Sequence, residues 1–271
     1  MIKFLATFIL CAVFLNANVL NEKVKNLIGE NNYEIHKSLV SMLFQDESKF
    51  RANKKIQYFK LFKELQQNGL MNLKLDKPRD ITIEFKTTNQ DIKAYKILND
   101  TIQALGYRYF FTKSMKLDEE KHLVWKIVFK AEYMIDPVML ISELRLNNCK
   151  VLDVVNKQNN HWYYEIDFKN SKLQSAQKVA KFEKLKFSKP LRALFLEVDN
   201  PTSLFVLSRN LNNWFPHIVL FDKDLKVLDV IKKNSIHKKL KTNISPETRY
   251  IKINDLYNLV NIKRGLTVIV R

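Results

Sequence analysis

The chain has 271 residues, 46% of them hydrophobic, and carries 46 Lys and Arg against 28 Asp and Glu, a net charge of +18. Its four glycines and two cysteines argue against Gly-rich phosphate loops and a disulfide-dense scaffold. A charge this positive is typical of nucleic-acid-binding proteins, but here it is mostly lysine and is spread over every segment. Two interpretations stay open: a compositional bias, or attraction to anionic envelope surfaces such as phospholipid headgroups or acidic glycans.

Residues 1–17 predict a cleavable signal peptide. Lys3 precedes an apolar run over residues 4–15, which has the length of a signal h-region and falls short of the about 20 residues that a spanning helix needs. Ala17 supplies a small residue at the cleavage position. An uncleaved anchor and an ordinary core helix are the alternatives. We therefore expect a periplasmic protein starting near Asn18, with no spanning segment after cleavage and no nucleic-acid partner.

Residues 18–79 predict an amphipathic helical segment. Apolar residues at helical spacing form one expected helix face from Ile35, Leu39, Met42 and Leu43. A second expected face consists of Tyr58, Leu61, Phe62 and Leu65. Helices this short must pack on the next segment of the chain or on another protein.

Residues 80–168 predict an α+β domain. Alternating apolar residues indicate strands over residues 80–85, 107–117, 122–133, 150–155 and 161–168. Helical spacing indicates a helix over residues 95–105, and Asp136-Pro137 starts a second one, because the carboxylate caps it and proline suits the first turn. This order predicts a ferredoxin-like split β-α-β-β-α-β domain with an extra strand.

The last part of the chain predicts a linker and a β domain. Residues 169–190 contain seven lysines and one glutamate, which favours a basic linker; a short amphipathic helix on a membrane surface is the alternative. Residues 191–271 contain six short apolar runs separated by turn residues. This pattern predicts a small antiparallel β-sandwich or barrel.

Catalytic and metal-binding motifs are missing from the sequence. No H-E-x-x-H, C-x-x-C or G-x-S-x-G occurs, and the five histidines are scattered. Asp222 and Asp224 suit a hairpin turn better than a calcium loop, because Lys223 and Lys226 lie among them. We expect no catalytic residue, no metal and no cofactor, and therefore no enzyme.

One aromatic and amide-rich stretch is the candidate contact site. Its residues are Arg209, Asn213, Trp214, Phe215 and His217. Aromatic and amide side chains on a β-domain loop can stack on and hydrogen-bond a sugar or an extended peptide. Alternatively, Trp214 and Phe215 fill the end of the core, or the stretch is a protein interface.

These observations favour a non-catalytic, exported interaction or scaffold protein, such as an accessory component of a bacterial envelope assembly. Its expected partners are envelope proteins, with an anionic glycan or lipid surface as a further candidate. The alternative is a glycan- or peptidoglycan-binding module that uses the C-terminal β domain. A hydrolase with an unfamiliar site is the least favoured interpretation.

Overall fold

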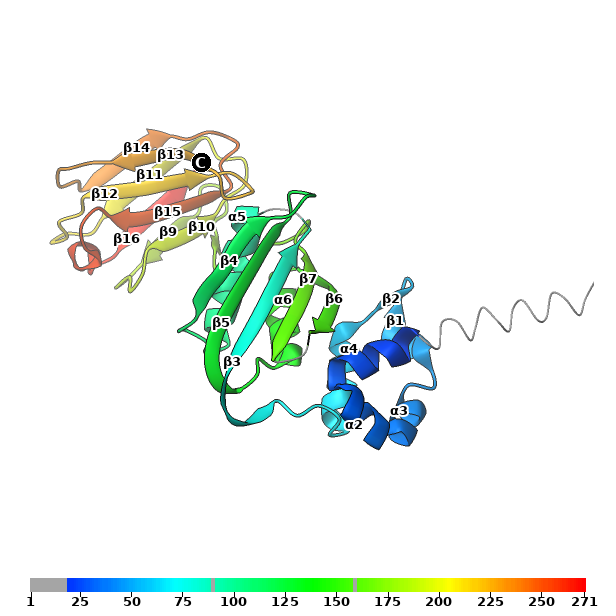
Figure 1. Ribbon diagram of the computed structural model, residues 1–271. Coiled ribbons are helices and arrows are strands. Elements are labelled where there is room, and N and C mark those ends of the chain that lie inside the picture. Colours follow the sequence, from blue (N-terminus) through cyan, green and yellow to red (C-terminus); the bar gives the residue numbers. More distant parts are fainter. Residues whose placement is uncertain (1–18, 89–90, 158–159) are drawn as a thin grey trace, which may run out of the picture. The chain divides into compact units, whose positions relative to one another are not determined.

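The computed structural model describes residues 19–88, 91–157 and 160–271 (Figure 1). The signal peptide expected over residues 1–17 lies outside the described residues. The chain forms two compact units that divide between Lys172 and Leu173. With 26% helix and 38% strand in several sheets, the predicted α+β class is confirmed. Among the described residues, no helix is both long and apolar enough to cross a membrane.

The first unit begins with short helices. Residues 19–28 are helical and are followed by α2 (Glu30–Ile35), α3 (Lys37–Leu43), η1 (Glu47–Phe50), the hairpin β1 (Arg51–Ala52) and β2 (Lys55–Ile56), and α4 (Tyr58–Gln67). The second predicted helix face is confirmed, because all four of its residues on α4 are buried. The first is wrong: Ile35 and Met42 are exposed, because the helix is interrupted at His36 and Val40 takes the buried position instead.

These helices pack against a sheet of the same unit. Lys23 Nζ donates to Asp153 Oδ1 at 2.8 Å and to the Val154 carbonyl at 3.3 Å. The Tyr58 hydroxyl donates to the same Asp153 carboxylate. Asn26 accepts from the backbone N–H of Asn156 and donates to its carbonyl. The helical segment therefore hydrogen-bonds to an outer strand of the sheet.

That sheet has five strands, and two helices connect some of them. Its elements are β3 (Lys74–Thr87), α5 (Asp91–Ala104), β4 (Phe111–Leu117), β5 (Leu123–Tyr133), α6 (Pro137–Leu146), β6 (Lys150–Asn156) and β7 (His161–Asp167). The strand order is β4-β5-β3-β7-β6. Strand β7 lies between β3 and β6 and runs parallel to β3, whereas the other neighbours are antiparallel. Figure 1 shows α5 and α6 on one face of this sheet, where Phe85, Trp125 and Tyr164 are buried.

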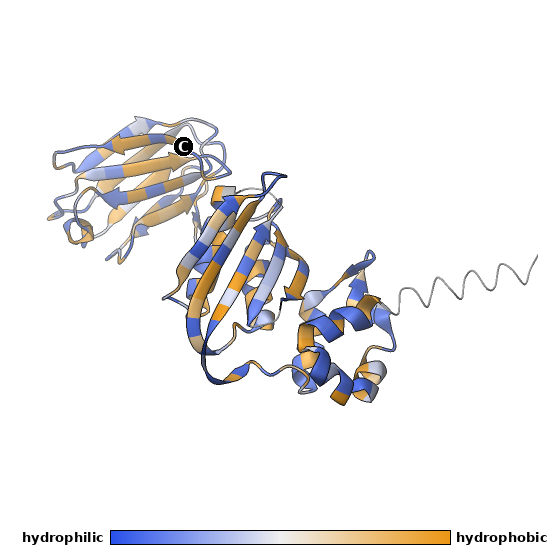
Figure 2. Cartoon of the chain, viewed as in Figure 1, coloured by the Kyte–Doolittle hydropathy of each residue, from blue (hydrophilic) through white to orange (hydrophobic). Residues whose placement is uncertain are grey.

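The second unit consists of two sheets around one core. Its elements are β8 (Gln177–Lys178), β9 (Lys184–Phe187), β10 (Leu194–Glu197), β11 (Ser203–Ser208), β12 (Pro216–Phe221), β13 (Val227–Lys232), β14 (Lys239–Asn243), β15 (Tyr250–Asp255), η2 (Leu259–Ile262) and β16 (Leu266–Val270). The strand orders are β13-β12-β15-β10-β8 and β14-β11-β16-β9. Leu196 and Ile253 of one sheet share a buried cluster with Val206 and Val268 of the other. Figure 2 shows hydrophobic and hydrophilic residues alternating along these strands.

The segment predicted as a linker, residues 169–190, differs from the prediction. It contains β8 and β9, which pair with β10 and β16, and the second unit already begins at Leu173. Leu173 and Val179 are buried. The lysines of β9 alternate with apolar residues and are exposed, so a charge-rich segment adds an edge strand to the sheet.

Candidate functional site

Four connections meet at one end of the second unit, and together they are called the basic end here: residues 188–193, 209–215, 233–238 and 256–265. In one sheet, Leu266 pairs with both Phe187 and Ser208, so β9 and β11 end where β16 begins. In the other sheet, Pro216 pairs with Asp255, so β12 begins where β15 ends. The connection 233–238 lies there too, because Lys232 at the end of β13 pairs with His217 and Lys239 at the start of β14 pairs with Leu207. The connection from β15 to β16 joins these edges of the two sheets, so all four connections lie at the same end.

The basic end holds seven Lys and Arg residues and no Asp or Glu. The seven are Lys189, Arg192, Arg209, Lys233, Lys238, Lys263 and Arg264. All seven are exposed. Within the described part of the chain, none of them forms a salt bridge. This end therefore presents concentrated and uncompensated positive charge.

The opposite end of the same unit has a mixed charge. Its connections, residues 179–183, 198–202, 222–226 and 244–249, carry four Lys and Arg and five Asp and Glu. Here the charges pair: Arg249 bonds Glu197 and Asp199, each at 2.7 Å. The two ends of one domain thus differ in charge, which a uniform excess of lysine does not produce.

Large apolar side chains are also exposed on each of the four connections at the basic end. They are Leu191 (94% exposed), Leu211 (76%), Ile236 (49%), Tyr257 (62%) and Val260 (61%). At the opposite end, Phe182 is the one exposed large apolar residue in the four connections. The basic end therefore combines apolar loop tips with cations.

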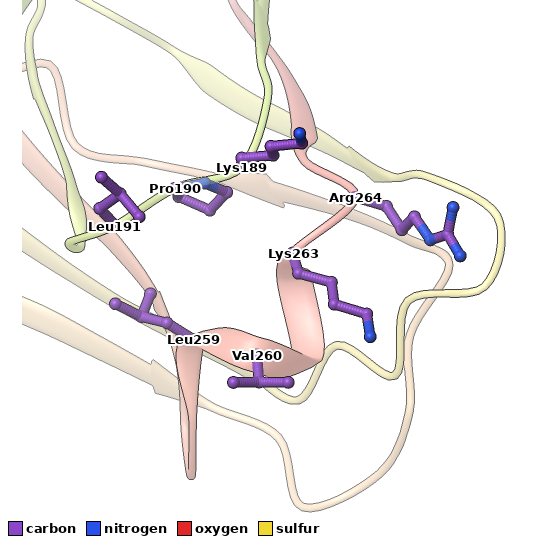
Figure 3. A pocket seen from close by; sticks show the side chains of 7 residues that line it. All are labelled: Lys189, Pro190, Leu191, Leu259, Val260, Lys263 and Arg264. Atoms are coloured by element: carbon purple, nitrogen blue, oxygen red, sulfur yellow. The ribbon is translucent and has the colours of Figure 1, made fainter.

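A cavity of about 520 Å³ opens at this end (Figure 3). Its apolar lining comes from Pro190, Leu191, Leu259 and Val260, on the first and last connections. Lys189, Lys263 and Arg264 also line it. Figure 3 shows Lys263 and Arg264 projecting on one side and Leu191 and Leu259 on the other. A ligand here would contact an apolar surface with cations at its margin.

A buried carboxylate organises the loops of the basic end. Asp255 is 3% exposed and accepts hydrogen bonds from the backbone N–H groups of Phe215 (2.8 Å), Tyr257 (2.9 Å) and Asn258 (2.9 Å). It also accepts from the Asn261 side-chain amide at 2.9 Å. These donors are backbone and amide N–H groups, so the carboxylate is used inside the fold, and one buried carboxylate beside seven cations leaves this end positively charged.

A buried amide, Asn212, ties its own connection to residues 233–238 and 256–265. The Asn212 side chain accepts from the Arg264 backbone N–H at 3.0 Å and donates to the Gly265 carbonyl at 2.8 Å. The backbone carbonyl of Asn212 accepts from Lys238 Nζ at 2.7 Å. The Tyr257 hydroxyl also hydrogen-bonds Asn234. The tips therefore project from a fixed backbone.

The residues predicted for a contact site fall into three environments. Trp214 is fully buried, and its indole Nε1–H donates to the Asn254 carbonyl at 3.0 Å, so this side chain fills the core rather than forming a surface platform. Arg209 and Asn213 are exposed on the basic end. Phe215 is half-buried, with its ring edge-to-face on Tyr257 at 5.0 Å. His217 lies on β12, where burial and then Lys232 and Lys252 lower its pKa.

Sequence reasoning missed the cavity residues on the first and last connections. Lys189 lies in the predicted linker and Leu191 is the first residue of the predicted β domain, and residues 188–193 carry no carboxylate. The available signal was the absence of Asp and Glu from alternate connections. Alternate connections of an antiparallel domain tend to share one end, because each strand reverses direction.

A second cluster lies at the β4–β5 turn of the first unit. Ligand atoms of Asp118, Glu120 and His122 lie within 4.8 Å of one another, a spacing that could hold a metal ion. However, Lys86 Nζ lies 3.0 Å from the Asp118 carboxylate and 3.7 Å from that of Glu120. The two carboxylates are therefore already paired with a cation of the protein. Hydrogen bonds from the His122 backbone N–H and from Lys86 lower the pKa of Asp118.

Comparisons with known proteins add no functional evidence. No family model matches the chain, and no curated protein does. Among solved structures, a match is a novel beta-glucosidase from Paenibacillus barengoltzii, with 12% identity over 34% of this chain and 11% of that chain. Its TM-score of 0.18 is too low to carry an argument about fold or activity.

Proposed function

We propose that the protein is a non-catalytic, exported interaction protein of the bacterial cell envelope, and that its basic end binds an anionic surface of its partner. The observation that carries this proposal is the polarity of the second unit: seven cations without carboxylates at one end, and four cations with five carboxylates at the other. Clustered charge of one sign attracts opposite charge and accelerates its encounter.

The finer architecture belongs to the same proposal. The first sheet is a ferredoxin-like split β-α-β-β-α-β unit into which β7 is inserted as the extra strand. The order β4-β5-β3-β7-β6 supports this, with β5 between β4 and β3. The second unit is a small β-sandwich, supported by two sheets that share one buried cluster. Both are scaffolds on which loops can carry binding.

The two alternative functions have less support. The glycan-binding alternative is centred on stacking by Trp214, and this indole is buried; Tyr257 is the aromatic ring that the basic end exposes. A hydrolase needs a nucleophile or a pair of groups with separate acid and base roles. Glu84 and His161 lie 3.1 Å apart, but Lys126 and Lys157 also bind this carboxylate at 3.1 and 3.2 Å, as in a structural ion cluster.

Binding to an immobilised anionic polymer tests the proposal. We expect the chain from Asn18, which contains every described residue, to elute from heparin at a salt concentration that falls sharply when Lys189, Lys263 and Arg264 are changed to Glu. A matched control changes Lys181, Lys223 and Lys226 to Glu, which alters the net charge equally at the opposite end. Equal losses in the two variants would show that only net charge matters and would refute the proposal.

Export is tested separately. Protein recovered from the cell-envelope fraction should begin near Asn18 by mass spectrometry. An intact Met1 in the cytosolic fraction would contradict the periplasmic assignment.

A further inference from the structure

We propose that the anionic surface is a phospholipid membrane and that the apolar tips of the basic end insert into it. This inference rests on the proposed function and names its partner. It makes the second unit a peripheral membrane-docking domain, held by ionic contacts to headgroups and by side chains placed among the acyl chains.

The distribution of apolar residues carries the inference. Each of the four connections exposes at least one large apolar side chain, and Leu191 and Leu211 are 94% and 76% exposed. Interfacial segments bury such side chains about 5–10 Å deep, at the boundary of headgroups and acyl chains. Loop tips at one end of a domain can reach this depth together, whereas residues on a strand face cannot.

The cations lie where headgroups would be. Lys189, Lys263 and Arg264 line the margin of the same cavity whose lining includes Leu191 and Val260. Each Lys or Arg near an anionic leaflet strengthens attachment roughly fivefold. Because no carboxylate lies on the four connections, nothing at this end repels the phosphates.

A membrane fits this surface better than a glycan or a folded protein does. Leu191, Leu211 and Val260 offer a sugar no hydrogen bond, and their exposure in water is unfavourable until an apolar phase covers them. The tips stand on separate connections that each also carry at least one exposed cation, whereas a stable protein interface has an apolar centre depleted of charge. A fluid bilayer can receive separated tips without a complementary shape.

The rigid backbone of the basic end favours insertion. Asp255 and Asn212 hydrogen-bond three of the four connections into one arrangement. Preorganised groups lose less conformational entropy when they bind. The tips on these three connections, which include Leu211 and Val260, therefore reach the membrane without first being ordered.

Vesicle sedimentation of the chain from Asn18 tests the inference. We expect binding to vesicles of phosphatidylcholine with phosphatidylglycerol, weak binding to phosphatidylcholine alone, and weakening by salt. Changing Leu191 and Val260 to Ser should lower vesicle affinity at least about tenfold, because two apolar side chains no longer enter the acyl region. The double change keeps all seven cations of the basic end, so a fall in vesicle affinity reports the apolar contacts. The matched control changes Phe182 and Val227, exposed outside the basic end, to Ser and should bind as the wild type does.

The outcomes separate the two proposals. Heparin binding without vesicle binding, or full vesicle binding by the Leu191→Ser/Val260→Ser variant, overturns membrane insertion and leaves the proposed function standing. Failure to bind either probe overturns both. As a direct readout, a Leu191→Trp variant should show a blue-shifted emission on vesicles and quenching by lipids brominated in their acyl chains; no quenching overturns insertion.

Discussion

Replacing Trp214 by Ala should unfold the second unit rather than remove a ligand contact. The side chain is fully buried in the cluster shared by both sheets, and its Nε1–H satisfies the Asn254 carbonyl at 3.0 Å. Truncating a buried Trp to Ala costs about 3–5 kcal/mol, through lost burial and the cavity left behind. A Trp214→Phe change keeps much of the apolar volume but leaves that carbonyl without its donor, at a cost of about 1–3 kcal/mol.

Hydrogen exchange as a function of urea is the suitable assay, since it reports on each unit separately. Amides of β11 and β16 in Trp214→Ala should lose protection at lower urea, while β3 and β5 of the first unit stay protected. Leu191→Ala serves as the control, because this side chain is 94% exposed and its truncation should cost less than about 1 kcal/mol. If Trp214→Ala were within about 1 kcal/mol of the wild type, the core role assigned to this indole would be refuted.

Three further changes test other parts of the structure. Gly265→Ala should destabilise the second unit by more than about 2 kcal/mol in thermal unfolding, because its Cβ would lie 1.9 Å from a backbone oxygen at φ +100°; Gly106→Ala, at φ +94° with open space around it, should cost about 1 kcal/mol in the first unit. Burial raises the pKa of the Cys149 thiol to about 12, so Ellman's reagent should react with this thiol only after unfolding. The buried neutral thiol should stabilise the fold fully below about pH 9, and this contribution should disappear as the pH rises towards 12. Burial alone would raise the pKa of Glu84, but hydrogen bonds from Lys126 and Lys157 outweigh burial and lower it. Glu84→Gln should therefore lower the free energy of unfolding by roughly 1 kcal/mol at neutral pH. The loss should be smaller below about pH 4, where the carboxylate of the wild type becomes protonated.

The regular elements of the fold could be predicted where the sequence pattern is unambiguous. In β5, Leu123, Trp125, Ile127 and Phe129 alternate and are all buried. Helix α6 begins where Asp136 and Pro137 predict it, with the carboxylate accepting from the N–H groups of Val138 and Met139. Local chemistry decides these elements, so one sequence suffices to find them.

Elements that depend on a distant partner could not be predicted in this way. Strand β14 has one buried residue, Leu240, among lysines and polar residues, and pairs with β11 more than thirty residues earlier. The interruption at His36 likewise has no signal in the local pattern, since the spacing from Ile35 to Leu43 suits one continuous helix. In both cases the deciding energy comes from neighbours that the local pattern does not reveal.

Side-chain type alone could not decide between the two interpretations of the predicted contact residues, a binding surface or the end of a core. Trp214, Phe215 and the nearby amides have the residue types of a binding surface. A large ring on a connection between two strands can nevertheless fill the core. Leu191 and Val260 look like ordinary core residues in the sequence, and the structure exposes both. Burial, which the sequence does not contain, reverses the two assignments.

The topology also bears on the two interpretations of the positive charge. A compositional bias towards lysine would act on all connections of the second unit alike, because no step in such a bias distinguishes one end of a domain from the other. The connections at the basic end carry no carboxylate, whereas those at the opposite end carry five. The two sets of connections alternate along the sequence, so the difference in carboxylates becomes visible only when the connections are grouped by the end of the domain at which they lie. The proposed approach to an anionic surface accounts for this difference between the two ends, whereas a bias that acts on all connections alike predicts no difference.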